Sequence, residues 1–174
     1  KSYNVFKFSE LSDKAKRKAI ENLCYVNVDH GWWDCTYEDA KTIGLKINGF
    51  DLDIDRGSYY KGDLVESAED SANLIIENHG KNRETYKTAE QYLKDRSELV
   101  KKYSDGKKTD IVAENNEYDF DNDCDELDAE FLKSLCEDYR ILLQHEYEHL
   151  TSEKAIIETI ECNEYDFTED GKID

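Results

Sequence analysis

The sequence predicts an α+β fold, in which a small antiparallel sheet packs with several helices, including a long helix near residues 127–150. Two observations support this class. Apolar residues alternate in a few short segments and recur at helical spacing in longer ones, and the segments follow the order β, α, α, β, β, several α and a closing β. A length of 174 residues fits a single α+β domain over 1–174, with a polar and acidic segment at about 104–126.

The first elements are a strand and two helices. Tyr3–Phe8 alternates as an opening strand does. Ser12 is placed to cap a helix that continues through Cys24. Trp33–Ile43 has the pattern of a second helix, and Gly44 stands just past its end, where glycine commonly terminates helices.

A β-hairpin follows. Leu45–Ile54 reads as a strand whose alternation changes parity once, near Gly49, which predicts a bulge there. Asp55–Ser58 has the residue types of a turn, and Tyr59–Val65 returns as the partner strand.

The second half is mainly helical. Glu66–Asn78 and Arg83–Tyr103 are expected to be helices, separated from the next by a polar loop over Ser104–Asn116. Leu127–Leu150 carries the longest amphipathic pattern of the chain. These segments predict a helical layer around the hairpin.

The end of the chain predicts a short helix and a turn. Thr151 or Ser152 can cap a helix through Cys162, and Tyr165–Asp174 resembles a small hairpin. The pentapeptide Asn-Glu-Tyr-Asp-Phe occurs twice, at 116–120 and 163–167. It is either a coincidence in an acidic, tyrosine-rich chain or a pair of similar exposed strands.

Charge is arranged in blocks of one sign. The net charge is −19, yet residues 1–20 carry six bases against two acids, and residues 81–108 carry nine bases against five acids. Residues 110–130 hold ten carboxylates and no Lys or Arg, and residues 158–174 hold seven acids and one base. Such blocks produce a directional field that suits a basic partner, typically a protein that itself holds nucleic acid.

Two rows of carboxylates are the candidate binding residues. If each row is a strand, its alternate carboxylates share one face at a spacing of about 6.6–7 Å. Such a row is similar to the dense negative charge of a nucleic-acid backbone, although a solvated face that aids solubility is the alternative. The predicted partner-binding surface comprises Asp51, Asp53, Asp55, Glu117, Asp119, Asp121, Asp123, Asp125 and Glu126.

Two metal sites compete with this interpretation. Asp119, Asp121, Asp123 and Glu130 match ligand positions of a helix–loop–helix calcium site, but Cys124 stands where the loop requires glycine. The segment from His145 to His149 matches H-E-x-x-H, in which two histidines one helical turn apart bind zinc and Glu146 acts as the base. No metzincin continuation follows it. We therefore expect no catalytic residue, cofactor or metal, with a zinc-dependent hydrolase as the alternative.

Other features limit the function classes. Five cysteines without a CxxC spacing favour a reducing compartment over a disulfide framework. No apolar run approaches the ~18–20 residues of a membrane span, and no signal-peptide pattern opens the sequence. We expect a cytoplasmic protein. Phosphate-binding loops and nucleophile elbows are absent from the sequence.

Several motifs resemble a family of small acidic proteins from bacteriophages and mobile elements. They are FSELSDKAKRKAI at 8–20, DHGWWD at 29–34 with YED at 37–39, GFDLD at 49–53 with DRGSY at 55–59, LTSEKAI at 150–156, and the acidic segment 161–171. Within this family the chain resembles the type II-A anti-CRISPR proteins, which block the RNA-guided DNA nuclease of bacterial immunity.

The resemblance implies a non-enzymatic inhibitor in the cytoplasm of the bacterial host, with no catalytic residues to assign. Its partner would be a type II CRISPR nuclease with its guide RNA, which holds nucleic acid in positively charged channels. A DNA-mimicking acidic surface agrees with this, and we expect that the chain itself does not bind nucleic acid directly, because like charges repel. An acidic structural or antitoxin-like phage protein is the remaining alternative.

Overall fold

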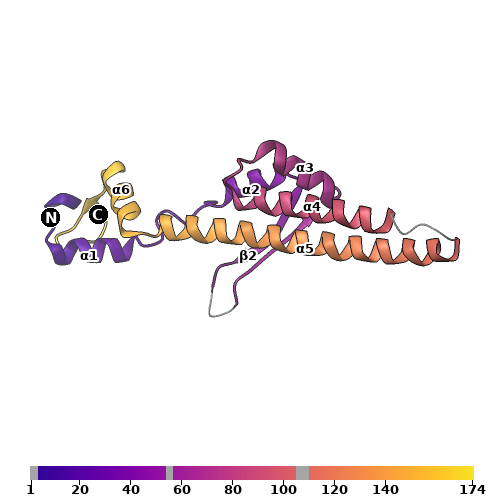
Figure 1. Cartoon of the computed structure of the whole chain (residues 1–174). Helices are drawn as coiled ribbons and strands as arrows, with labels where there is room; N and C mark the ends of the chain where they lie inside the picture. Colours follow the sequence, from indigo (N-terminus) through magenta and orange to yellow (C-terminus); the bar gives the residue numbers. More distant parts are fainter. Residues whose placement is uncertain (1–3, 54–56, 105–109) are drawn as a thin grey trace. The chain divides into compact units, whose positions relative to one another are not determined.

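The computed structural model confirms the α+β class, with small antiparallel sheets and a long helix (Figure 1). It describes residues 4–53, 57–104 and 110–174, with the backbone alone over 110–117. The chain separates into a terminal unit (residues 1–34 and 144–174) and a central unit (residues 35–143). Each unit has its own hydrophobic core. The sequence patterns did not predict this division.

The terminal unit brings together the two ends of the chain. Its elements are β1 (Phe6–Lys7), η1 (Phe8–Glu10), α1 (Asp13–Asn22), α6 (Glu153–Cys162) and β4 (Asp166–Phe167). β1 pairs with β4 in antiparallel register, and the two helices close over a small core of Phe8, Leu11, Ala15, Ala19, Ile156, Ile160 and Phe167.

Serine caps begin both helices of the terminal unit, as the sequence predicts. The Ser12 hydroxyl accepts a hydrogen bond from the Ala15 N–H, and the Ser152 hydroxyl accepts one from the Ala155 N–H, both at 3.3 Å. The predicted opening strand is shorter than expected, because the chain turns into η1 at Phe8 and buries that ring against Phe167.

The central unit begins with a helix and the predicted hairpin. α2 (Asp34–Thr42) is followed by a turn that ends at Gly44, whose φ of +72° explains the glycine. β2 (Leu45–Asp51) pairs with β3 (Tyr59–Leu64) in antiparallel register, and the register shifts between Ile47 and Gly49. The sequence therefore predicted both the hairpin and its bulge.

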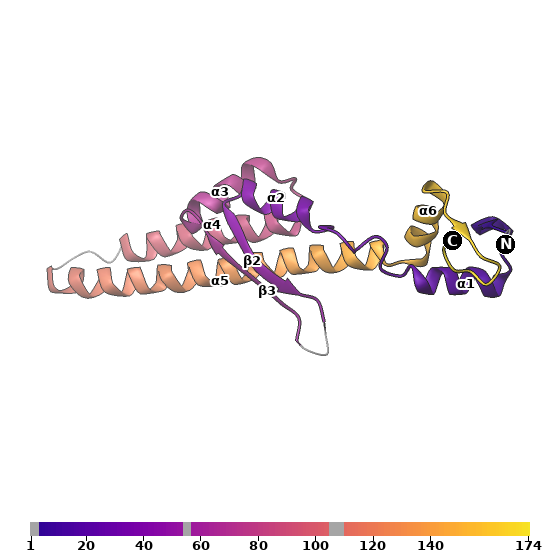
Figure 2. The same cartoon turned by 180° about the vertical axis from the view of Figure 1, so that it is seen from behind.

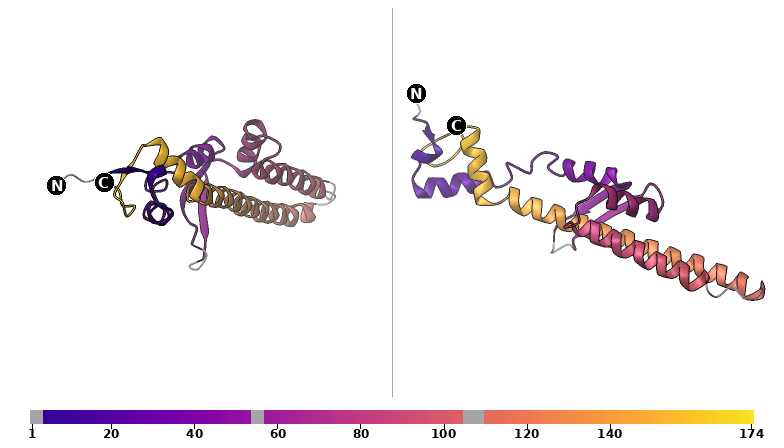
Figure 3. Two further views of the ribbon diagram at one scale, coloured as in Figure 1. Left: turned by 90° about the vertical axis from the view of Figure 1, so that its left-hand side faces the viewer. Right: turned by 45° about the horizontal axis from the view of Figure 1, so that its top comes forward.

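Three helices complete the central unit: α3 (Ala68–Asn78), α4 (Glu84–Ser104) and α5 (Asp110–Leu150), the last continuing into residues of the terminal unit. α4 and α5 run side by side and antiparallel in every view (Figures 1, 2 and 3). Tyr92 of α4 packs its ring on Phe131 of α5, with ring centroids 4.4 Å apart. The core buries Leu135 and Tyr139 of α5 with residues of α2, β2, α3 and α4.

The long helix begins much earlier than the sequence predicts. Residues 110–126, interpreted as a polar segment, belong to α5. A row of side chains at helical spacing explains the difference, because Phe120, Cys124, Leu127 and Phe131 are all partly or fully buried and lie on one side of the helix. Packing of this row against α4 outweighs the low helix propensity of the aspartates.

The repeated pentapeptide is not a structural repeat. Its first copy, 116–120, is helical within α5. In its second copy, Glu164 has a φ of +52°, and Asp166 and Phe167 form β4. The interpretation as two similar strands is therefore wrong. Although α4 and α5 have the length of a membrane span, no described helix has a stretch apolar enough to cross a membrane.

Candidate functional site

The predicted strand of carboxylates at 119–125 is wrong, because these residues lie in α5. Successive residues of an α-helix are separated by about 100° around the axis, so alternate residues point to nearly opposite sides. Asp119 and Asp123 share one side of α5, whereas Asp121 and Asp125 lie on the other. The same geometry contradicts the calcium loop, since the helix continues without a turn through its ligand positions.

The other predicted row is interrupted at Asp51, where β2 ends. The Asp51 Oδ1 atom accepts a hydrogen bond from the Asp53 N–H at 2.9 Å, which turns the chain out of the strand. Aspartate favours such local turns because its side chain competes with the sheet for backbone donors. Asp51 and Asp53 are half-buried. Asp55, with the side chain of Glu117, lies outside the described residues.

Two carboxylates of the acidic segment hold α5 to α4. Asp123 accepts a hydrogen bond from the Tyr103 hydroxyl at 2.7 Å and one from the Lys102 ammonium at 3.1 Å, and these two bonds lower the pKa of Asp123. Asp128 accepts a hydrogen bond from the Tyr92 hydroxyl at 2.6 Å and faces Arg96 at 3.4 Å. Both carboxylates therefore have a structural role, and the prediction that Asp123 also binds a partner stays a prediction.

The remaining carboxylates of this part of α5 face solvent. We call them the outer carboxylates: Asp119, Asp121, Asp125, Glu126 and Glu130. Within the described residues, none of them forms an ion pair with Lys or Arg; Glu126 accepts a 3.4 Å hydrogen bond from Asn122. Tyr118, on the turn before them, has 75% of its side chain exposed. Tyrosine is among the residues that are enriched at protein interfaces.

The helix brings the outer carboxylates closer together along its axis than a strand would. Residues 119–130 cover about 17 Å of axis, so the five charges occur about once per 4 Å. Along one strand of DNA the phosphates follow at about 3.4 Å. The helix thus carries negative charge of similar density along its axis, but on two sides: Asp119, Glu126 and Glu130 lie on one side of α5, and Asp121 and Asp125 lie on the other.

The H-E-x-x-H segment lies on the last turns of α5, in the terminal unit. His145, Glu146 and His149 are exposed, and Tyr147 between them packs its ring near Trp32, with ring centroids 5.7 Å apart. A catalytic zinc needs three protein ligands. Across the described residues, no group of three His, Cys, Asp or Glu side chains is placed to hold a metal ion. The geometry therefore offers no third ligand to this pair.

The central unit also contains a partly buried polar network that the sequence did not predict. Both Asp39 carboxylate oxygens accept hydrogen bonds from Arg83, at 3.0 and 2.7 Å, and Oδ2 also accepts one from Tyr139 at 2.8 Å. The Nε2 atom of His79 lies 3.7 Å from the same oxygen, and Nδ1 lies 2.7 Å from the Thr85 hydroxyl. No motif in the sequence links these residues.

This network has the components of a catalytic triad but not its access. His79 and Thr85 are buried, so the hydroxyl that the histidine would activate cannot reach a substrate in solution. Burial lowers the pKa of His79, and Arg83 lowers it further. The network instead joins α2, the end of α3, the start of α4 and the middle of α5.

Comparison of the chain with protein-family models, curated proteins and solved structures gives no match. The site must therefore be interpreted from its own residues.

Proposed function

We propose that this protein is a non-enzymatic inhibitor that binds the nucleic-acid-binding surface of a partner protein through the outer carboxylates of α5. The supporting observation is a cluster of five exposed carboxylates, on two sides of α5, that have no Lys or Arg partner among the described residues, on a chain of net charge −19. A surface evolved for phosphates presents Lys and Arg, and attracts such a cluster at long range.

The partner that we propose is a type II CRISPR nuclease with its guide RNA, in the bacterial cytoplasm. Its positively charged channel for nucleic acid suits a helix that carries carboxylates on two sides, and its arginines that read the PAM lie in the region where DNA must enter. The resemblance of the chain's motifs to type II-A anti-CRISPR proteins supports this choice. Charge then accelerates association, while Tyr118 supplies the aromatic contact that interfaces favour.

Binding and cleavage assays with purified components test this function. The protein should bind the guide-loaded nuclease, inhibit cleavage of a matched DNA target, and lose binding when the nuclease is first saturated with a non-cleavable target. It should not shift labelled DNA or RNA at physiological salt, because like charges repel. Undiminished cleavage at saturating protein would contradict the nuclease as partner, and a direct nucleic-acid shift would contradict the mimicry.

A further inference from the structure

The β2–β3 hairpin has a second, chemically different surface. In the described residues β3 pairs only with β2, so its other edge has no neighbouring strand. Edge strands present unpaired N–H and C=O groups that can pair with another chain. This surface is separate from the outer carboxylates of α5, and the inference below does not depend on the proposed function.

The hydrogen bonds between β2 and β3 show which backbone groups of β3 point away from β2, toward its unpaired edge. The Val65 N–H donates to the Gly44 carbonyl at 2.8 Å, so Val65 directs its backbone groups toward the β2 side. Because this direction alternates along an antiparallel strand, Asp63 also faces β2, whereas Gly62 and Tyr60 face outward.

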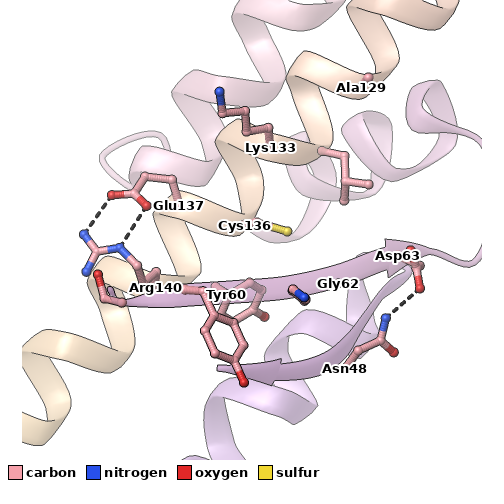
Figure 4. Close-up of a pocket in the computed structure, with 13 residues that line it drawn as sticks. Asn48, Tyr60, Gly62, Asp63, Ala129, Lys133, Cys136, Glu137 and Arg140 are labelled. Atoms are coloured by element: carbon pink, nitrogen blue, oxygen red, sulfur yellow. Dashed lines mark hydrogen bonds and ion pairs between the residues drawn. The ribbon is translucent and has the colours of Figure 1, made fainter. Parts of the chain in front are cut away.

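A groove of about 610 Å³ runs between this edge and α5. On one side it is lined by residues 58–63. On the other it is lined by a single stripe of the helix: Ala129, Leu132, Lys133, Cys136, Glu137 and Arg140. Figure 4 shows the Cys136 sulfur pointing from the helix to the strand beside Gly62.

Glycine at position 62 allows this close approach. A Cβ atom there would lie 3.1 Å from both the Leu45 Cδ1 and the Lys46 carbonyl oxygen, and 3.6 Å from the Cys136 sulfur. Packing around Gly62 therefore fixes this part of the groove. The length of the groove suits a peptide in an extended conformation. The helical stripe covers about 17 Å of axis, which corresponds to about five residues of β-strand.

The charges of the groove differ from those of the chain as a whole. Lys61, Lys133 and Arg140 line it, against Asp63 and Glu137. Arg140 is held by Glu137 through hydrogen bonds of 2.7 and 2.8 Å. Lys61 and Lys133 have no carboxylate partner within the described part of the chain, although Lys61 lies over the Tyr59 ring at 5.5 Å. A cationic groove on a protein of charge −19 selects an acidic occupant.

We propose that this groove binds an extended acidic peptide, which adds an antiparallel or parallel strand to the free edge of β3. Main-chain hydrogen bonds to Tyr60 and Gly62 would provide the affinity, as in other cases of strand addition beside a helix. The Gly62 N–H, which faces away from β2, can donate to a peptide carbonyl. Lys61 and Lys133 would select for carboxylates.

The test uses an acetylated and amidated hexapeptide in which Glu and Val alternate. Its control replaces each Glu by Lys, which keeps the strand propensity and inverts the charge. Two further versions carry N-methyl groups on alternate amides, one version for each edge of the peptide. Binding is measured by titration calorimetry, and amide hydrogen exchange is followed at Tyr60 and Gly62 in the intact protein.

We expect the Glu/Val peptide to bind and to slow exchange at Tyr60 and Gly62, whereas the Lys/Val peptide does not bind. Only one of the two N-methylated versions should lose binding. The double variant Lys61→Gln/Lys133→Gln should weaken binding by about 3- to 10-fold, the effect of two exposed charges. Lys94→Gln/Lys101→Gln, which removes two exposed lysines of α4 that lie outside the groove, should leave it unchanged.

Three outcomes overturn the proposal. The first is no binding at millimolar Glu/Val peptide. The second is binding without slower exchange at Tyr60 and Gly62, or with equal sensitivity to both N-methylated versions. The third is protection of these amides without peptide that grows with protein concentration, which would assign the edge to a second copy of the chain.

Discussion

The Tyr139 hydroxyl donates a hydrogen bond to Asp39 Oδ2 at 2.8 Å and thereby joins α5 to α2 inside the central unit. Tyr139 is fully buried, and Asp39 also holds Arg83 through two hydrogen bonds. Burial alone would raise the pKa of Asp39, but the hydrogen bonds from Arg83 and Tyr139 bring it below its ordinary value. Tyr139 therefore adds to the effect of Arg83 in keeping Asp39 ionised.

Tyr139→Phe should lower the free energy of unfolding by about 1–2 kcal/mol, because a partly buried carboxylate loses one donor while Arg83 remains. Tyr118→Phe is the matched control, since Tyr118 is 75% exposed and should change stability by less than about 0.5 kcal/mol. Urea denaturation of both variants measures the difference. Equal stability of the two would show that the Asp39 bond contributes nothing.

The buried His79 predicts a pH dependence of stability. Burial lowers the pKa of His79, so the unfolded chain takes up a proton at a higher pH than the folded chain does. The free energy of unfolding should therefore decrease as the pH falls below about 6.5, the ordinary value, and receive no contribution from His79 above it. Denaturation curves between pH 5 and pH 8 should be flatter in this window for His79→Gln.

His145→Gln provides the control for that measurement, because His145 is exposed and has no role in the core. Its pH profile should follow that of the parent protein. If His79→Gln keeps the parent's full slope, the pH dependence must arise from other groups and the assignment to His79 is wrong.

Gly171 and Gly57 form a matched pair in the left-handed region, with φ values of +80° and +84°. A Cβ at Gly171 would lie 2.2 Å from the Ala15 carbonyl oxygen, whereas a Cβ at Gly57 would have no neighbour within 4 Å among the residues that the structure describes. Gly57→Ala should cost about 1–2 kcal/mol from the backbone conformation alone. Gly171→Ala should cost about 1–3 kcal/mol more, because α1 must move. If both variants lose a similar free energy of unfolding, the predicted clash between a Cβ at position 171 and Ala15 is wrong.

Zinc analysis tests the alternative hypothesis that the H-E-x-x-H segment at the end of α5 belongs to a zinc-dependent hydrolase. Protein purified without chelator should contain no stoichiometric zinc, because His145 and His149 have no third ligand in the described part of the chain. Elemental analysis by mass spectrometry gives the answer directly. One zinc per chain that disappears in His145→Ala would instead support the hydrolase.

Local signals in the sequence were sufficient for most of the fold. Ser12 and Ser152 begin their helices, Gly44 ends one, and the parity change at Gly49 marks the bulge. Each of these features depends on residues a few positions apart. The start of α5 was missed because alternating aspartates suggested a strand, although the row from Phe120 to Phe131 carried the helical signal.

The candidate site was harder to predict, because exposure depends on tertiary contacts. Asp123 and Asp125 are alike in the sequence, yet Asp123 is bound to Tyr103 and Lys102 of α4 while Asp125 faces solvent. The partners of Asp123 lie about twenty residues away along the chain and become neighbours only when the two helices pack. Sequence alone therefore predicted the charge of the segment but not which charges are available.

The central claim is that the outer carboxylates guide the protein to a basic partner surface. Its test variant neutralises all five, with Asp119, Asp121 and Asp125 changed to Asn and Glu126 and Glu130 changed to Gln. The control variant makes the same change of net charge at exposed glutamates elsewhere, by Glu→Gln substitution at Glu77, Glu90, Glu98, Glu146 and Glu161. Both should fold, because exposed carboxylates contribute little to stability.

The deciding measurement is the association rate constant with the guide-loaded nuclease, recorded over a series of salt concentrations. For the test variant we predict a rate about tenfold or more below that of the parent at low salt, with a flatter salt dependence, since such charges act mainly on association. The control variant should stay near the parent in both. Equal rates and equal salt slopes for the two variants would contradict the claim. They would indicate that the acidic segment is only a solvated surface.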